Sequence, residues 1–369
     1  MFERRLYFHV DWLLLGAILL ITGIGIAMIY STTYVTLPEG GHAGPQVRTQ
    51  VYALVLGLVA FIVFLSIDYR MLAENSLFMY GGLCVLLLFV LVKGSTQMGA
   101  QRWIPIGPFN LQPSEFGRIV LALVLAMFFG ENRRGARNTG DLVTGGIFTG
   151  VPLLLIAKQP DLGTAVTLIP VFLGIAFLAG LRMRLLGILA LVAVVVVAPV
   201  AWKFALKDYQ KARIMTFLNP EQDPRGEGYQ QIQARITVGS GGLTGKGFRG
   251  GTQGQYKFLP VAHNDFIFSV LAEEQGYLGV LAVLGLYLFV ILRSLQAARL
   301  AKDRLGAYLV GGIIAGFSFQ AIYNVAMSAG LAPVKGITLP LMSYGGSSLI
   351  AALASFGLII NVRMRRFTN

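Results

Sequence analysis

The sequence has few residues that carry covalent or metal chemistry. It has 369 residues but one cysteine, Cys84, so no intrachain disulfide can form. Its three histidines, His9, His42 and His263, stand far apart and match no zinc-ligand spacing. These absences exclude a disulfide framework and a zinc site of the usual pattern.

Charge is also scarce. Only 13% of the residues are charged and 55% are hydrophobic, whereas a soluble domain carries roughly 25% charged residues. Apolar runs of about 20 residues, the length that crosses a bilayer, recur along the chain. The first run, 11–30, is longer than the ~7–15-residue core of a signal peptide, and no A-x-A cleavage site follows it. The sequence therefore predicts a polytopic integral membrane protein that keeps its first span.

We expect an all-α bundle of ten transmembrane helices, forming one polytopic domain over residues 1–369. One long connection, at about 207–264, joins the seventh and eighth spans. The ten predicted spans are 11–32, 48–67, 75–92, 112–130, 141–157, 162–180, 184–206, 265–292, 305–332 and 338–362.

The lysines and arginines of the short loops predict the orientation. Fifteen lie on the side that holds both termini, and five lie on the other side. Because short cytoplasmic loops carry the excess of positive charge, both termini are expected in the cytoplasm and the long loop outside. That loop also has a surplus of basic residues, which indicates either an anionic ligand at the outer surface or a solvated loop beside anionic lipid headgroups. No nucleic-acid partner is expected.

The glycine-rich stretch 239–254 resembles a phosphate-binding loop only at first sight. The Walker pattern fails, because Ser240 stands where it needs glycine and Gly247 where it needs serine or threonine. Residues 245–250 fit G-x-G-x-x-G, but no βαβ unit can surround them. What remains is a flexible external loop whose Lys246 and Arg249 could meet phosphate.

Three helix entrances carry acidic residues, at Glu115, Asp161 and Asp265. Taken alone, each acid could cap or neutralise a helix N-terminus. Arg118 lies one turn after Glu115 on the same helix face, which favours an ion pair in surroundings poor in water. All three entrances are expected at the outer leaflet, near Lys158 and Lys335. Since ionisable groups at a membrane mark function, this gathering predicts a cleft where a carboxylate is a general base and cations hold a diphosphate.

These residues are part of an ordered set of motifs along nearly the whole chain. The set resembles the SEDS family (shape, elongation, division and sporulation) of peptidoglycan glycosyltransferases, and its RodA branch most. Asn264 departs from the family's usual threonine, and 333–340 reads more like the division branch. The motifs are Gly99-Ala-Gln-Arg-Trp103, Gln112-Pro-Ser-Glu115, Gln159-Pro-Asp-Leu-Gly-Thr164, Gly228-Tyr-Gln-Gln-Ile232, Gly239-Ser-Gly-Gly242, His263-Asn-Asp-Phe-Ile-Phe268 and Ser343-Tyr-Gly-Gly-Ser347.

The resemblance implies a bacterial inner-membrane enzyme that polymerises lipid II into glycan strands, in cell elongation and rod-shape maintenance, and releases undecaprenyl diphosphate. It implies Asp265 as the catalytic base, and a class B penicillin-binding protein as partner beside membrane lipids. Mg²⁺ or Mn²⁺ would suit the diphosphate, although no cofactor is required by the sequence. Glu273 and Glu274, deeper in the eighth span, are expected to be structural or to line a groove. The expected substrate-binding residues are Arg48, Arg102, Glu115, Arg118, Lys158, Asp161, Lys246 and Lys335.

Two other classes of protein compete with this hypothesis. A lipid II flippase could line a passage with the same charges, but its passage would need polar residues at both leaflets and transporters of this kind often show inverted repeats. Neither feature is evident in the sequence. A structural scaffold for a wall-building complex would explain the spans and leave the outer charges unexplained.

Overall fold

The structure, a computed structural model, is a bundle of long apolar helices. It describes residues 9–34, 43–97, 100–106, 109–131, 139–180, 208–223, 226–255, 258–260 and 262–367, with single positions between 187 and 203. The helices are α1 (Trp12–Thr33), α2 (Pro45–Ser66), α3 (Tyr69–Glu74), α4 (Ser76–Lys93), α5 (Pro113–Glu131), α6 (Thr139–Lys158), α7 (Leu162–Leu178), α10 (Asp208–Leu218), α11 (Glu227–Ser240), α12 (Thr252–Gln255), α13 (Ile267–Arg299), α14 (Arg304–Ser328) and α15 (Gly346–Met364), and two 3₁₀ turns follow Asn219 and Met364.

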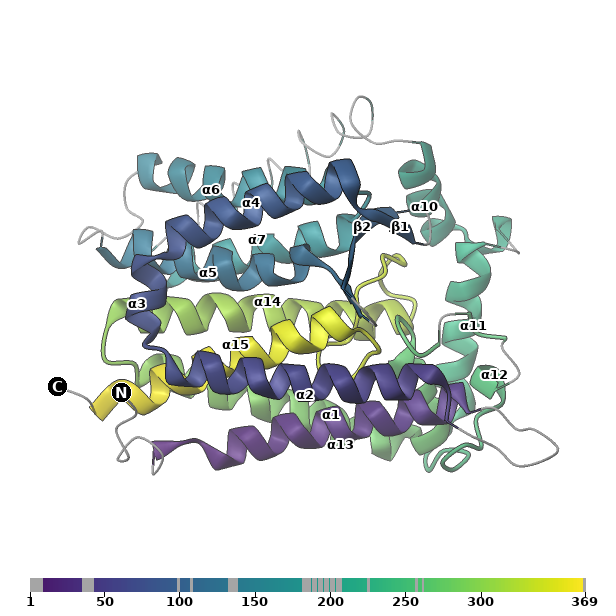
Figure 1. The fold of residues 1–369 in the computed structure, drawn as a ribbon. Helices are drawn as coiled ribbons and strands as arrows, with labels where there is room; N and C mark the ends of the chain where they lie inside the picture. The colour runs from purple at the N-terminus through teal and green to yellow at the C-terminus, as the bar shows by residue number, and fades with distance from the viewer. Residues whose placement is uncertain are drawn as a thin grey trace.

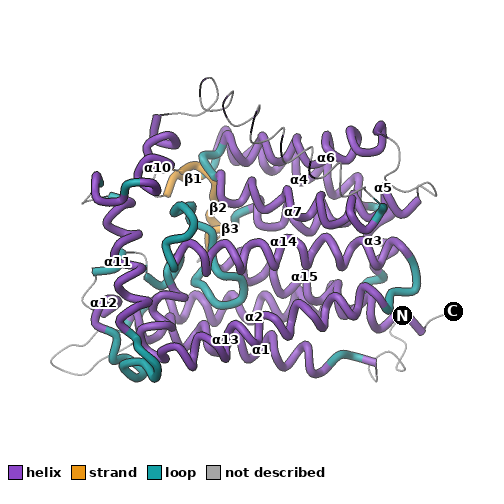
Figure 2. The backbone as a smooth tube through the Cα atoms, turned by 180° about the vertical axis from the view of Figure 1, so that it is seen from behind, coloured by secondary structure: helices purple, strands orange, loops and turns teal. Residues whose placement is uncertain are grey.

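The long helices run side by side and give the bundle two distinct ends (Figure 1). At one end, called here the terminal end, α1 begins and α15 finishes. At the other, called the loop end, lie the strands and helices α10, α11 and α12 (Figure 1). The view from behind shows the same division, with the strands and most of the loop segments gathered at the loop end (Figure 2). Segments far apart in sequence therefore meet at the loop end.

The helical class of the fold is confirmed. Eight helices in the described part of the chain are long and apolar enough to cross a membrane, and α7 is a shorter apolar helix. The expected seventh span, 184–206, lies outside the described residues. The eighth span is longer than the expected 265–292, because α13 continues to Arg299.

The predicted start of the last span is wrong. We expected a span over 338–362, but α15 begins at Gly346 and the residues before it form turns. Leu339, Leu341 and Met342 are nevertheless almost fully buried. Their apolar character therefore reflects burial inside the protein, which hydropathy cannot distinguish from burial in lipid.

A small sheet at the loop end was not expected. Its three antiparallel strands are β1 (Ser95–Gln97), β2 (Ala100–Ile106) and β3 (Phe109–Leu111), in the order β1-β2-β3. Ser95 pairs with Trp103, and Ile104 with Leu111. The sheet links α4 to α5 and so carries the chain from Lys93 into the Gln112-Pro-Ser-Glu115 motif.

Burial separates the inner helices from those that face lipid. In the apolar windows of α15 and α5, 89% and 72% of the residues are buried, against 22% for α4 and α6. Phe78 and Val92 on α4 are 86% and 76% exposed. Large apolar side chains so exposed are explained by a hydrocarbon environment. The chain is thus an integral membrane protein with α5, α14 and α15 near its centre.

Candidate active site

Asp265 lies in the turn that precedes α13, at the loop end, and its side chain is half-buried. Phe266 occupies the N-cap position of α13, and no side chain caps this helix. Neither Asn264 nor Asp265 therefore occupies the N-cap position of α13. The Asp265 carboxylate faces the segment before α15, since a Cβ added to Gly336 would lie 3.7 Å from Asp265 Oδ2.

A buried amide on α14 fixes the backbone around this carboxylate. Asn324 Nδ2 donates to the carbonyl oxygen of Asp265 at 2.9 Å and to that of Ile337 at 2.7 Å. The side chain of Asn324 is fully buried, and its amide group has only these two N–H donors to give. One side chain thus ties the turn that carries Asp265 to the segment that faces it.

Glu115 and Arg118 form the ion pair that their spacing predicts. Arg118 Nη2 lies 2.5 Å from Glu115 Oε2, and the two side chains are 13% and 9% exposed. Arg118 also donates to Gln320 on α14, and Gln320 Nε2 donates to Thr338 Oγ1 at 3.2 Å. The pair is therefore connected by hydrogen bonds to the segment that faces Asp265.

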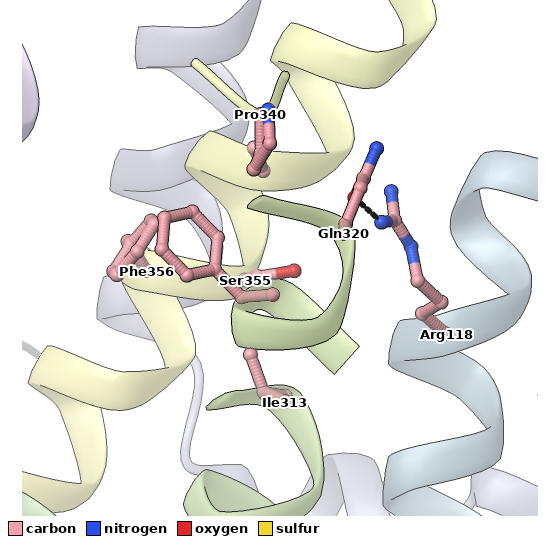
Figure 3. A pocket seen from close by; sticks show the side chains of 8 residues that line it. Arg118, Ile313, Gln320, Pro340, Ser355 and Phe356 are labelled. Atoms are coloured by element: carbon pink, nitrogen blue, oxygen red, sulfur yellow. Dashed lines mark hydrogen bonds between the residues drawn. The ribbon is translucent and has the colours of Figure 1, made fainter. Parts of the chain in front are cut away.

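Two small pockets meet at Arg118. One has a polar lining and includes Glu115, Thr164 and Gly336, so it adjoins the glycine that faces Asp265. The other lies between α5, α14 and α15, where Arg118 and Gln320 meet on one side and Ser355 and Phe356 lie on the other (Figure 3). The first pocket has a polar lining and room for about one water molecule, whereas Ile313, Phe317 and Phe356 give the second an apolar wall.

Asp161 is the centre of a second cluster. Arg102 Nη1, from β2, lies 3.1 Å from Asp161 Oδ1, and Gln112 Nε2 donates to Asp161 Oδ2 at 2.7 Å. Asp161 also caps α7, because it accepts from the backbone N–H of Thr164 at 3.3 Å. The carboxylate is buried and so needs these partners. The cap expected for this acid is thus present, together with an ion pair.

Lys246 forms an ion pair with Glu273. Its Nζ is 2.6 Å from Glu273 Oε1, and that carboxylate is fully buried. Glu273 also accepts from the backbone N–H groups of Thr252 and Gln253 at the start of α12. These contacts give Glu273 the structural role expected of it. In the structure, the charge of Lys246 is balanced by a protein carboxylate.

The glycine-rich loop bridges a break in α13. Gly276, with φ 65° and ψ −167°, interrupts the helix, and a side chain at this φ would be strained. Gly245 approaches so closely that an added Cβ would lie 2.2 Å from Glu274 O. Four backbone hydrogen bonds join the loop to both sides of the break: Lys246 N to Glu273 O, Gly247 N to Glu274 O, Tyr277 N to Gly242 O and Leu278 N to Leu243 O.

The remaining expected cations occupy three positions at the loop end. Arg48 is exposed in the first turn of α2, and Lys158 is exposed at the end of α6. Lys335 is half-buried and directly precedes Gly336, the residue that faces Asp265. The structure therefore places Lys335 next to Gly336 in the chain and the Glu115–Arg118 pair on the pocket that includes Gly336, while Arg102 and Lys246 each pair with another carboxylate.

His263 precedes Asp265 by two residues and packs against Tyr344. The two rings stand edge to face with centroids 5.5 Å apart, and Tyr344 N donates to His263 O at 3.0 Å. Burial lowers the pKa of the His263 imidazole below its usual value. A neutral ring at physiological pH therefore stabilises this contact between the Asp265 turn and the segment before α15.

Sequence reasoning missed Asn324 and Gln320, the two α14 side chains that connect the site. A signal was present: both are polar, both lie inside the apolar run 305–332, and they are spaced by one helical turn. Polar residues in a span face the interior of a bundle. No sequence pattern indicated which backbone carbonyls Asn324 would hold.

A divalent cation would find no preformed protein cage in the described part of the chain. No group of three His, Cys, Asp or Glu side chains is placed there to hold one. Asp265 offers one carboxylate, whereas Mg²⁺ bound by protein side chains alone needs several oxygen ligands. Because Mg²⁺ is usually bound by one or two carboxylates together with substrate phosphates and waters, Asp265 and the leaving diphosphate would be the groups to hold it.

The chain belongs to the FtsW/RodA/SpoVE family of cell cycle proteins, whose family model matches residues 11–367. It is 39% identical over 341 residues to the peptidoglycan glycosyltransferase MrdB of Escherichia coli. The aligned region covers 92% of this chain and 91% of that protein. It is 37% identical over 362 residues to a probable peptidoglycan glycosyltransferase FtsW of Trichlorobacter lovleyi, covering 95% of this chain and 92% of that one.

Two solved structures share the fold. A chain of a peptidoglycan synthase complex that coordinates polymerisation and crosslinking matches with a TM-score of 0.83 and 32% identity, over 98% of this chain and 99% of that one. The rod shape determining protein RodA of Thermus thermophilus matches with a TM-score of 0.71 and 29% identity, over 98% of both chains. The family resemblance seen in the motifs is thus confirmed across the whole fold.

Proposed function

We propose that this chain is a peptidoglycan glycosyltransferase that polymerises lipid II into glycan strands, with Asp265 as its general base. The relatives named above are a peptidoglycan glycosyltransferase and a probable one by name, which supports the class of enzyme. The observation that carries the assignment of Asp265 is its position: a half-buried carboxylate before the N-cap residue of α13 that faces Gly336, in a turn fixed by Asn324. A carboxylate used only for helix stability would not need this arrangement.

The proposed reaction joins two lipid-linked sugars. Asp265 accepts the proton of the 4-hydroxyl of the N-acetylglucosamine of an incoming lipid II. That oxygen forms a bond to the anomeric carbon of the N-acetylmuramic acid at the end of the growing strand. The bond from this carbon to undecaprenyl diphosphate breaks with inversion, and the diphosphate leaves with the electron pair. A positioned general base contributes about 10²–10⁴-fold, so positioning and diphosphate stabilisation supply much of the remaining rate.

The leaving diphosphate needs positive charge close to Asp265. Lys335 is next to Gly336, and Arg118 lines the polar pocket that includes Gly336. We assign the binding of the leaving diphosphate to these two cations. Arg48 and Lys158 are exposed, and we assign them to the path by which the diphosphate of the substrate approaches from the bilayer. Arg102 and Asp161 shape the wall of the site through their ion pair, and Lys246 positions the glycine-rich loop on Glu273.

The proposal places the loop end at the outer face of the bacterial inner membrane, with both termini in the cytoplasm. Lipid II and the nascent strand then reach Asp265 from the outer leaflet. The likeness to RodA and MrdB supports a role in elongation and rod-shape maintenance. The likeness to a chain of a peptidoglycan synthase complex supports a class B penicillin-binding protein as partner, because crosslinking requires a transpeptidase.

Strand synthesis by purified protein tests the function and the base together. The complex with the penicillin-binding partner, whose transpeptidase site is inactivated, should make long glycan strands from lipid II in detergent. Asp265→Asn keeps the shape of the side chain but removes the base, so it should bind lipid II and make no strands. Glu221→Gln, at an exposed carboxylate of the loop end, should match the wild type. Strands from Asp265→Asn would remove Asp265 from catalysis, and none from a folded wild-type complex would reject the polymerase function.

A further inference from the structure

A polar pocket lies at the terminal end of the bundle, at the opposite end of α13 from Asp265. It is formed where the start of α1 meets the last turns of α13 and α15, and its polar and aromatic lining is His9, Asp11, Trp12, Arg293, Arg363 and Arg366. None of these residues takes part in the proposed reaction. Their type and arrangement therefore call for a separate explanation.

The carboxylate of Asp11 is already saturated. Its Oδ2 accepts from Arg293 Nε at 2.8 Å, and its Oδ1 accepts from Arg293 Nη2 at 3.3 Å. Oδ1 also accepts from the backbone N–H of Leu14, which caps α1, and Arg363 forms an ion pair with Oδ2. The Asp11 side chain is 1% exposed. Asp11 thus serves as a structural anion for two arginines at once.

The pocket is lined by more positive than negative side chains. Three guanidinium groups and one carboxylate line it, which leaves a formal charge of +2 when His9 is neutral. Each guanidinium presents five N–H donors, and the one carboxylate of the lining has only two oxygens to accept them. Convergent arginine donors in a concave site suit the oxygens of a phosphate group.

Trp12 places the pocket at the depth of lipid headgroups. It lines the pocket while its side chain is 65% exposed, and the neighbouring Leu13 is also 65% exposed. Tryptophan is enriched where a membrane meets water, because its ring is apolar and its N–H is polar. An exposed tryptophan at the first turn of a span therefore marks the interface, and the arginines beside it lie at headgroup level.

We propose that this terminal-end pocket binds the phosphate group of an anionic phospholipid from the adjacent leaflet. Basic pockets between transmembrane helices are suited to anionic lipid headgroups. The bound phosphodiester would neutralise the excess charge held by Arg293, Arg363 and Arg366, and would join the starts and ends of three helices. The inference is independent of the proposed polymerase function.

Native mass spectrometry of the full chain in neutral detergent tests this inference. Phosphatidylglycerol is the probe, phosphatidylcholine is the zwitterionic comparison, and inorganic phosphate is added as a competitor. We expect phosphatidylglycerol to bind and Arg366→Gln to weaken this binding about tenfold, a change that corresponds to ~1.4 kcal/mol. Arg304→Gln removes the same charge from an exposed position at the same end, outside the pocket, and should leave binding unchanged.

The outcomes separate the sources of the phosphate. If millimolar inorganic phosphate displaces phosphatidylglycerol from the wild type but not from Arg366→Gln, the ligand is a free phosphate. That result would overturn the lipid assignment. Equal losses in Arg366→Gln and Arg304→Gln would show attraction by net charge alone, and unchanged binding in both would place the lipid elsewhere. The double variant Asp11→Asn/Arg363→Gln guards against misfolding, because it removes one charge of each sign. It keeps the formal charge of the lining at +2, and is expected to retain phosphatidylglycerol binding to a folded chain.

Discussion

Asn324 holds the backbone of Asp265 by a single hydrogen bond of 2.9 Å, and the second N–H of the same amide holds Ile337. The distance between the proposed base and the segment that faces it is therefore set by one buried side chain on α14. Such a side chain touches no substrate and acts through Asp265, so it is a positioning residue.

Asn324→Leu should abolish most strand synthesis even in folded protein. The substitution leaves two carbonyl oxygens without their donor, and each buried unsatisfied polar group costs about 1–3 kcal/mol. Asn361→Leu is a matched control, because Asn361 also donates to backbone carbonyls, at the terminal end. Both variants should lower the thermal midpoint, but only Asn324→Leu should lower the rate per folded molecule. Equal rates per folded molecule would limit Asn324 to a structural role.

Arg118→Ala should destabilise the chain strongly. Removing one partner of a buried pair costs about 3–5 kcal/mol, because the other charge is left uncompensated. Glu115→Gln/Arg118→Gln, which removes both charges, should recover much of that stability without recovering strand synthesis if Arg118 holds the diphosphate. Arg299→Ala, at an exposed arginine of the terminal end, is the control. Thermal unfolding in detergent measures the first effect, and an activity restored by the double variant would remove Arg118 from substrate binding.

The stability of the fold should decrease as the pH falls below about 6.5, the ordinary pKa of histidine. Burial lowers the pKa of His263 in the folded chain, so the unfolded chain binds the proton first and acid favours unfolding. The contribution of neutral His263 to the free energy of unfolding is fully present above pH ~6.5. It is lost as the pH falls toward the lowered pKa of His263 in the folded chain. Thermal midpoints of wild type and His263→Gln at neutral and acidic pH measure it. A pH dependence unchanged by His263→Gln would contradict the assignment.

Labelling with an impermeant maleimide should reveal the orientation. In a Cys84→Ala background, Leu243→Cys places a thiol at a loop-end position that is 71% exposed, and it should react from outside the inner membrane. Arg299→Cys, at the terminal end, should react only after the membrane is opened. The reverse pattern would place Asp265 in the cytoplasm, where the growing glycan strand of the proposed reaction is absent.

The sequence predicts the spans well, because about 20 consecutive apolar residues have few alternatives to a membrane helix. It also predicts the Glu115–Arg118 pair, since a spacing of three residues fixes neighbours on a helix. It does not predict Arg102 beside Asp161, or Asn324 beside Asp265, because these contacts join elements far apart in the chain. Hydropathy also misplaced the start of the last span, where Leu339 and Met342 are buried by protein.

The break at Gly276 has a mechanical consequence. Residues 267–275 follow directly from Asp265 and are joined to the glycine-rich loop by backbone hydrogen bonds at Glu273 and Glu274, while the rest of α13 lies beyond the break. The helix is thereby divided into a short lever that carries the base and a long anchor in the bilayer. The same loop also accepts hydrogen bonds from Tyr277 and Leu278, beyond the break, so it works as a splint across the joint. Cutting or loosening the loop would therefore free the short lever and let Asp265 shift relative to Gly336, without any change to the residues that line the site.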